Sequence, residues 1–111
     1  MTHDVTMDSF ESVVDSNALV ILDFWAAWCG PCKIFAPVFE KAAELHPEVY
    51  FGKVNTEKAT ELAAAFAVRS IPTLMAFYRG DLVFEQPGML PLPQFESLIQ
   101  GLKDGMLKPL E

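Results

Sequence analysis

Four runs of hydrophobic residues along the chain predict the strands of a β-sheet. The run Leu19–Trp25 is interrupted only by Asp23, and such continuous hydrophobicity is typical of a strand buried on both faces. Three shorter runs predict further strands at 49–54, 73–78 and 82–86. Because only Arg79-Gly80-Asp81 separates the last two runs, we expect those strands to form an antiparallel hairpin.

Hydrophobic residues at every third or fourth position predict four helices around these strands. Three helices are expected at 8–15, 57–66 and 92–102. Asp8 and Glu11 predict a capping box at the start of the first. The remaining helix begins near Ile34 and contains Pro37, which we expect to kink it rather than end it because the hydrophobic spacing resumes afterwards. This alternation of strands and helices is the pattern of an α/β fold.

The length of the chain predicts a single domain. A chain of 111 residues is long enough for one hydrophobic core and too short for two, so we expect one domain over 1–111. The folded core is expected at about 5–103. The remaining residues, 104–111, are expected to form a mobile tail.

Charge and hydropathy exclude several classes of function. The net charge is −7 and the eight Lys and Arg residues are scattered, which argues against a nucleic-acid partner. The longest hydrophobic stretch is too short to cross a bilayer, so no membrane partner is expected. The first residues lack the basic start and apolar core of a signal peptide. We therefore expect a cytoplasmic protein, with a monomer as the default state.

The two cysteines form the motif Cys29-Gly30-Pro31-Cys32 between a predicted strand and a predicted helix. Two thiols at this spacing can close and reopen a disulfide ring. Cys29 would lie at the helix N-terminus, where free N–H groups favour a thiolate, so we expect it to be the attacking nucleophile. Cys32 would then release the substrate by closing the disulfide. Gly30 allows a tight turn, and Pro31 suits the first helical turn because its missing N–H is not needed there.

Two other interpretations of the cysteines stay open. They could be small buried residues without chemistry. They could also supply half of a tetrahedral metal site, but His3 and His46 lack ligand spacing, so such a site would have to be shared between two chains.

Asp23 and Lys53 are charged residues within predicted strands. Burial would raise the pKa of Asp23, which could then act as a general base for Cys32, or could equally be a satisfied core acid. Lys53 could pair with Asp23 or extend to solvent. Trp28 precedes Cys29 and could offer an apolar contact surface, and Ile71-Pro72 lies where a chain reversal would leave backbone groups of Ile71 free.

Together these residues resemble the thioredoxin family over roughly 5–103. The resemblance is carried by the segment Asp23-Phe24-Trp25-Ala26-Ala27-Trp28-Cys29-Gly30-Pro31-Cys32-Lys33, followed by Pro37, Lys53, Ile71-Pro72-Thr73, Gly80 and Gly88. It implies the thioredoxin fold, a central mixed sheet with helices on both faces. It also implies a protein-disulfide reductase that binds no cofactor itself and is recharged by a thioredoxin reductase using FAD and NADPH.

The resemblance also implies roles for individual residues. Cys29 is the nucleophile and Cys32 the resolving thiol, while Asp23 is a buried base with Lys53 as its partner. Pro72 is expected to be cis against the disulfide, and the backbone of Ile71 to pair with an extended substrate. The residues expected to form the substrate groove are Trp28, Gly30, Pro31, Ile71, Pro72 and Gly88.

The chain departs from the family pattern around Gly88, in the proline-rich stretch Gln86–Pro93 with Met89 after the glycine. This loop would border the groove, so it puts the choice of client in doubt. Two alternatives to a general reductase of client disulfides therefore remain. One is a dedicated reductase for a single client, and the other is a binding subunit whose thiols are dispensable.

Overall fold

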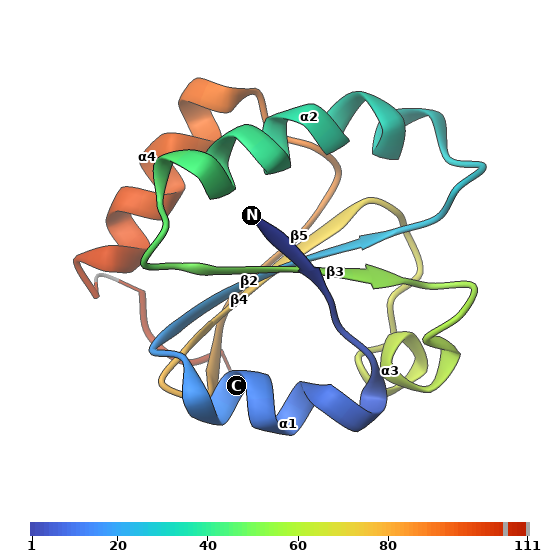
Figure 1. Cartoon of the computed structure of the whole chain (residues 1–111), viewed down its shortest axis with the longest axis horizontal. Coiled ribbons are helices and arrows are strands. Elements are labelled where there is room, and N and C mark those ends of the chain that lie inside the picture. The colour runs from blue at the N-terminus through green and yellow to red at the C-terminus, as the bar shows by residue number, and fades with distance from the viewer. Residues whose placement is uncertain (106, 111) are drawn as a thin grey trace.

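A computed structural model describes residues 1–105 and 107–110 of the chain. One mixed sheet of five strands, in the order β1-β3-β2-β4-β5, forms its centre (Figure 1). The strands are β1 (Thr2–Asp4), β2 (Leu19–Trp25), β3 (Tyr50–Asn55), β4 (Thr73–Tyr78) and β5 (Asp81–Pro87). The helices are α1 (Met7–Ser16), α2 (Gly30–Leu45), α3 (Thr60–Ala65) and α4 (Leu92–Lys103).

The strand β2 lies at the centre of the sheet and is paired on both sides. It runs parallel to β3 and antiparallel to β4, and β4 forms the expected antiparallel hairpin with β5. Every residue of β2 except Trp25 is buried. The predicted mixed sheet is therefore confirmed, and its most hydrophobic strand is the one that leads into the cysteine motif.

Helices cover both faces of the sheet, as predicted: α2 and α4 lie on one side, and α1 and α3 on the other (Figure 1). Alternate residues of β2 point to opposite faces, so Ile21 packs toward Phe35, Phe39 and Phe95, whereas the core on the other face includes Leu22. The rings of Phe39 and Phe95 stack with their centroids 6.0 Å apart. Each face of the sheet thus has its own hydrophobic core.

The helices differ from their predictions mainly at their ends. The start of α1 is capped at Thr6, whose N–H donates to Oγ of Ser9 at 3.0 Å, so the capping box predicted at Asp8 and Glu11 was wrong by two residues. Helix α2 continues through Pro37. Helix α3 begins only at Thr60, because the residues before it form a turn.

The hydrophobic pattern did not predict β1. This strand has three residues, two of them exposed, and pairs only with β3. Within the described residues, no helix is long and apolar enough to span a membrane.

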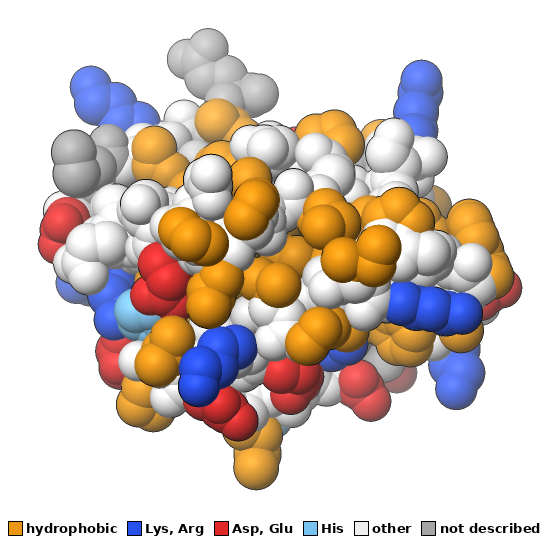
Figure 2. Space-filling view, turned by 90° about the horizontal axis from the view of Figure 1, so that it is seen from above, with side chains coloured by type: hydrophobic (Ala, Val, Ile, Leu, Met, Phe, Trp, Pro, Cys, Tyr) orange, Lys and Arg blue, Asp and Glu red, His pale blue; other side chains and the backbone are white. Residues whose placement is uncertain are grey.

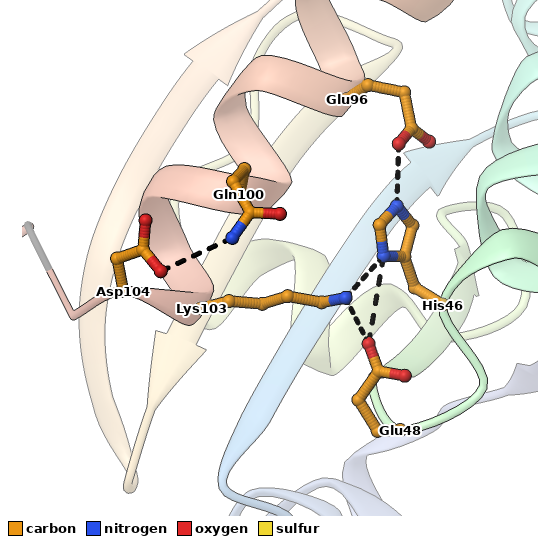
Figure 3. Close-up of polar contacts among 6 residues, drawn as sticks. All are labelled: His46, Glu48, Glu96, Gln100, Lys103 and Asp104. Carbon is orange, nitrogen blue, oxygen red and sulfur yellow. Dashed lines mark hydrogen bonds and ion pairs between the residues drawn. The ribbon is translucent and has the colours of Figure 1, made fainter.

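A polar cluster joins the end of α2 to α4 (Figure 3). The cysteines lie at the opposite end of α2. His46 follows the last residue of α2 and is 8 % exposed. Its Nε2 lies 2.7 Å from Oε2 of Glu96, and its Nδ1 lies 2.5 Å from Nζ of Lys103. Because a carboxylate only accepts and an ammonium only donates, Nε2 carries the proton and Nδ1 accepts from Lys103. Lys103 also pairs with Glu48, so the cluster fixes α4 against the end of α2.

The expected tail falls partly outside the described residues, which do not include Met106 and Glu111. Of the rest, Leu107 and Leu110 are exposed. The N–H of Leu110 donates to the carbonyl of Leu82 at 2.7 Å, so the chain returns to β5 near its end.

Candidate active site

The two cysteines lie shortly after the end of β2, at the start of α2. Cys29 is the N-cap residue of α2, and Cys32 lies in the first turn. They form a disulfide with their Cα atoms 5.2 Å apart. The N–H of Cys32 points at Sγ of Cys29 from 3.2 Å. An N–H donor and a helix N-terminus are groups that favour negative charge on a sulfur atom.

The loop before β4 lies against Cys29. The peptide bond between Ile71 and Pro72 is cis, as the resemblance implied. The carbonyl oxygen of Ile71 is 3.7 Å from Sγ of Cys29, and Ile71 packs against the hydrophobic cluster that contains both cysteines. This contact arises because β2 and β4 are antiparallel, so the start of β4 lies beside the end of β2.

Gly88 completes this side of the site. Its N–H donates to the carbonyl of Pro72 at 2.8 Å, and its φ of +93° is a conformation that favours glycine. Met89 follows it and is exposed. Five of the expected groove residues come from three segments of the chain. Gly30 and Pro31 lie in the first turn of α2, Ile71 and Pro72 lie in the loop before β4, and Gly88 follows β5.

Hydrophobic side chains are exposed around the disulfide, although both cysteines are buried. Trp28, directly before Cys29, is 68 % exposed. Ile34 is 63 % exposed and lies three residues after Pro31, on the same face of α2. Seen from above, hydrophobic side chains lie across the face that carries α2 and α4 (Figure 2).

Ile34 was not among the predicted site residues. The hydrophobic spacing of α2 assigns the buried face to Phe35, Val38, Phe39 and Ala42, and Ile34 lies off that face. A large hydrophobic residue outside the buried stripe of a helix is the signal that would have identified it.

Asp23 is buried beneath the motif. It is 1 % exposed, and neither carboxylate oxygen has a hydrogen-bond partner within the described part of the chain. It lies two residues after Ile21 along β2, so the two side chains point to the same face of the sheet, which is the face covered by α2. Burial raises the pKa of Asp23 to about 7, and the positive charge of Lys53 opposes that rise. A carboxyl that titrates near neutral pH is suited to accept a proton from a thiol.

Lys53 lies beside Asp23 but is not bonded to it. The two residues are partners in the register of β2 and β3. Nζ of Lys53 sits 5.1 Å from the ring centroid of Trp25, a cation–π contact, and the ion pairs found among the described residues do not include Asp23 with Lys53. Lys53 thus acts on Asp23 through its charge and not through a direct salt bridge.

The described residues contain no group of three or more His, Cys, Asp and Glu side chains placed to hold a metal ion. His3 stacks on Tyr50, and His46 belongs to the cluster beside α4. Neither imidazole approaches the cysteines.

Comparison with known proteins gives a consistent result. The family model described as Thioredoxin matches residues 1–101. A protein of Streptomyces coelicolor named "Putative thioredoxin 2" is 54% identical over 90 residues, covering 81% of this chain and 67% of that protein. The thioredoxin of Mycoplasma pneumoniae is 44% identical over 84 residues, covering 76% and 82%. A solved mutant thioredoxin from Halobacterium salinarum superposes with a TM-score of 0.83 at 32% identity, covering 90% and 88%.

Proposed function

This chain belongs to the thioredoxin family of thiol-disulfide oxidoreductases, and from that premise we propose that it is a general reductase of disulfides in client proteins. The observation that carries the proposal is the Cys29–Cys32 disulfide at the start of α2, with the backbone of Ile71 beside it. A helix N-terminus activates one sulfur, and exposed hydrophobic side chains surround it.

The reduced protein begins the reaction with the thiolate of Cys29. The thiolate attacks one sulfur of the client disulfide, forms a mixed disulfide and expels the other client sulfur as a thiolate, which takes a proton from solvent. The N–H of Cys32 stabilises the thiolate before attack. Cys29 is therefore the catalytic nucleophile.

The client binds as an extended segment across the loop before β4. The free backbone groups of Ile71 pair with the client backbone in the manner of an added strand. Trp28, Pro31 and Pro72 contact its side chains, and Gly30 and Gly88 allow its backbone to approach closely. Exposed Trp28 and the position of Ile71 beside Cys29 support this arrangement.

The second step releases the client. Cys32 attacks Sγ of Cys29, closes the disulfide and expels the client sulfur. Because Asp23 is buried on the side of the sheet that faces α2 and titrates near neutral pH, it accepts the proton of the Cys32 thiol, directly or through water. Lys53 stabilises the ionised form of Asp23 by its charge.

The oxidised protein is recharged by a partner. We assign this step to a thioredoxin reductase that carries FAD and uses NADPH, as membership of the thioredoxin family suggests, because each client reduction consumes the two electrons of the cysteine pair. A chain whose only cysteines form one redox pair is typical of a reducing compartment, which supports a cytoplasmic protein. We take a monomer as the default state, with client proteins and the reductase as its partners.

Reduction of insulin disulfides, with NADPH and a thioredoxin reductase, tests the proposal. We expect turnover by the native protein and none by Cys29→Ser, whereas Cys32→Ser should accumulate a mixed disulfide with insulin. Native protein that is reduced by the reductase but leaves insulin intact would contradict a general reductase.

A dedicated reductase for one client is the second candidate, and the exposed Met89 beside Gly88 favours it. Under this alternative, Met89→Ala would raise turnover with insulin. A general reductase predicts little change.

A further inference from the structure

A pocket of about 250 Å³ lies beside the disulfide and contacts only one of the two cysteines. Cys32 lines it, and Cys29 does not. Three alanines, including Ala27 and Ala36, contribute to its wall, and their small side chains leave the space open. This pocket is distinct from the client groove, which borders Cys29 through Ile71.

Two lysines border the pocket although the protein is acidic overall. Lys33 and Lys53 both line it, whereas the net charge of the chain is −7. Trp25 forms part of the wall, and its indole N–H has no hydrogen-bond partner in the described part of the chain. An apolar hollow lined in part by two lysines fits a small molecule that has a short carbon chain and a carboxylate within reach of an ammonium group.

We propose that this pocket takes a small thiol that carries a carboxylate, and that this thiol reduces the protein by attacking Cys32. The inference rests on the proposed function, because it requires a reducible Cys29–Cys32 pair. It adds a second class of reductant to the reductase, one that enters from the side away from the client groove.

The chemistry of the two sulfurs favours attack at Cys32. Thiol–disulfide exchange is faster when the sulfur that leaves is the more stabilised thiolate. Attack at Cys32 expels Cys29, whose negative charge is stabilised by the N–H of Cys32 and by the start of α2. Cys32 itself is only 4 % exposed, and the pocket that it lines is the route by which the inference brings a small molecule to its sulfur.

The reaction balances with two molecules of thiol. The first, as a thiolate, forms a mixed disulfide with Cys32 and releases the thiolate of Cys29. The second attacks the sulfur of the bound thiol, forms a small disulfide and releases the thiolate of Cys32. Two electrons pass to the protein, and the cysteines take their protons from solvent.

The same exchange run backwards gives a clean test with single-cysteine variants. Cys29→Ser leaves only Cys32, and Cys32→Ser leaves only Cys29. Each reduced variant is mixed with dithiodipropionate, which carries two carboxylates, or with neutral hydroxyethyl disulfide. Mass spectrometry after acid quenching gives the rate of mixed-disulfide formation. The ratio of the two rates cancels any change in the ionisation of the cysteine.

The expected result is a charge preference at Cys32 that depends on Lys33. In the Cys29→Ser background, Lys33→Gln should lower the anionic-to-neutral ratio about threefold, the size expected for one partly exposed ion pair. Lys41→Gln, on the exposed part of α2, is the matched control and should leave the ratio unchanged. Ala36→Leu fills the pocket and should slow both reagents at Cys32.

Two results would overturn the inference. One is a ratio at Cys32 that Lys33→Gln does not change. The other is an equal change of the ratio at Cys29 in the Cys32→Ser background, since that would indicate general surface charge and not a pocket. Reduction of insulin by the native pair is measured in parallel, so that failure of the proposed function is seen separately.

Discussion

The carboxyl group of Asp23 lies in an environment very unlike water, because it is 1 % exposed and has no hydrogen-bond partner in the described part of the chain. A polar residue in a continuous hydrophobic run is visible in sequence, so its burial could be predicted. Its relation to Lys53 could not, because the ammonium position depends on the path of a long side chain that settles over Trp25. Strand spacing alone gives the register of the pair and not the contact.

Asp23→Asn is expected to stabilise the protein at alkaline pH. The folded pKa of about 7 lies above the ordinary value near 4, so the folded state binds the proton more tightly. The native protein therefore loses stability as pH rises from about 4 to about 7, and Asn removes that loss. Above pH 7 the gain should be at most on the order of 4 kcal/mol. Urea unfolding of both oxidised proteins, at several pH values from about 4 to 8.5, measures it.

A pH-independent difference between Asp23→Asn and the native protein would contradict this origin of the effect. Glu11→Gln, which removes an exposed carboxylate from α1, serves as the control and should follow the native curve.

At the scale of elements, the hydrophobic pattern located the buried strands best. The bounds of β2 and β4 match their predictions, because strands buried on both faces are continuously hydrophobic. Helix α3 is shorter than predicted, since Asn55 accepts a hydrogen bond from the N–H of Glu57 and holds a turn there. Strand β1 carries no hydrophobic pattern and exists only through pairing with β3, which a local pattern cannot reveal.

The candidate site shows the same division. The cysteine motif and the burial of Asp23 could be predicted from local sequence, whereas the role of Asp23 as a base was implied only by the family resemblance. The proximity of Ile71 to Cys29 depends on the antiparallel pairing of β2 with β4, and here the family resemblance supplied what the pattern did not.

The cluster around His46 is expected to stabilise the packing of α2 on α4. His46→Ala removes the partner of the half-buried Glu96 and of Lys103, so we expect a loss of about 1–3 kcal/mol in the free energy of unfolding. Denaturant unfolding measures this, and insulin reduction should be unaffected because the cluster lies far from the cysteines.

Lys41→Ala provides the comparison for His46→Ala. Its pair with Glu44 is exposed on both sides, so its loss should change the free energy of unfolding by about 0–0.5 kcal/mol. Equal losses in the two variants would mean that the His46 cluster contributes no more than a surface ion pair.

At the scale of the molecule, one sheet separates two hydrophobic cores. Ile99 belongs to the core under α2 and α4, and Val54 to the core on the opposite face. Since the sheet lies between them, the losses of unfolding free energy in Ile99→Val and Val54→Ala should add in the double variant to within about 0.5 kcal/mol. Chemical denaturation of the four proteins of this cycle measures the coupling.

Phe39 and Phe95 give the contrasting cycle within one core. Their rings stack, so Phe39→Leu and Phe95→Leu should show a coupling of at least about 0.5 kcal/mol. Strong coupling between Ile99 and Val54 would show instead that strain passes through the sheet.

The double pairing of β2 also determines how the protein moves. A strand with hydrogen-bonded neighbours on both sides has no low-energy local opening, so its amides exchange with solvent only when the whole domain unfolds. We therefore expect the chain segment that leads into the cysteine motif to belong to the slowest-exchanging part of the molecule. We expect this segment to stay in place during the redox cycle, and any rearrangement to occur in the first turn of α2 and in the loops around it.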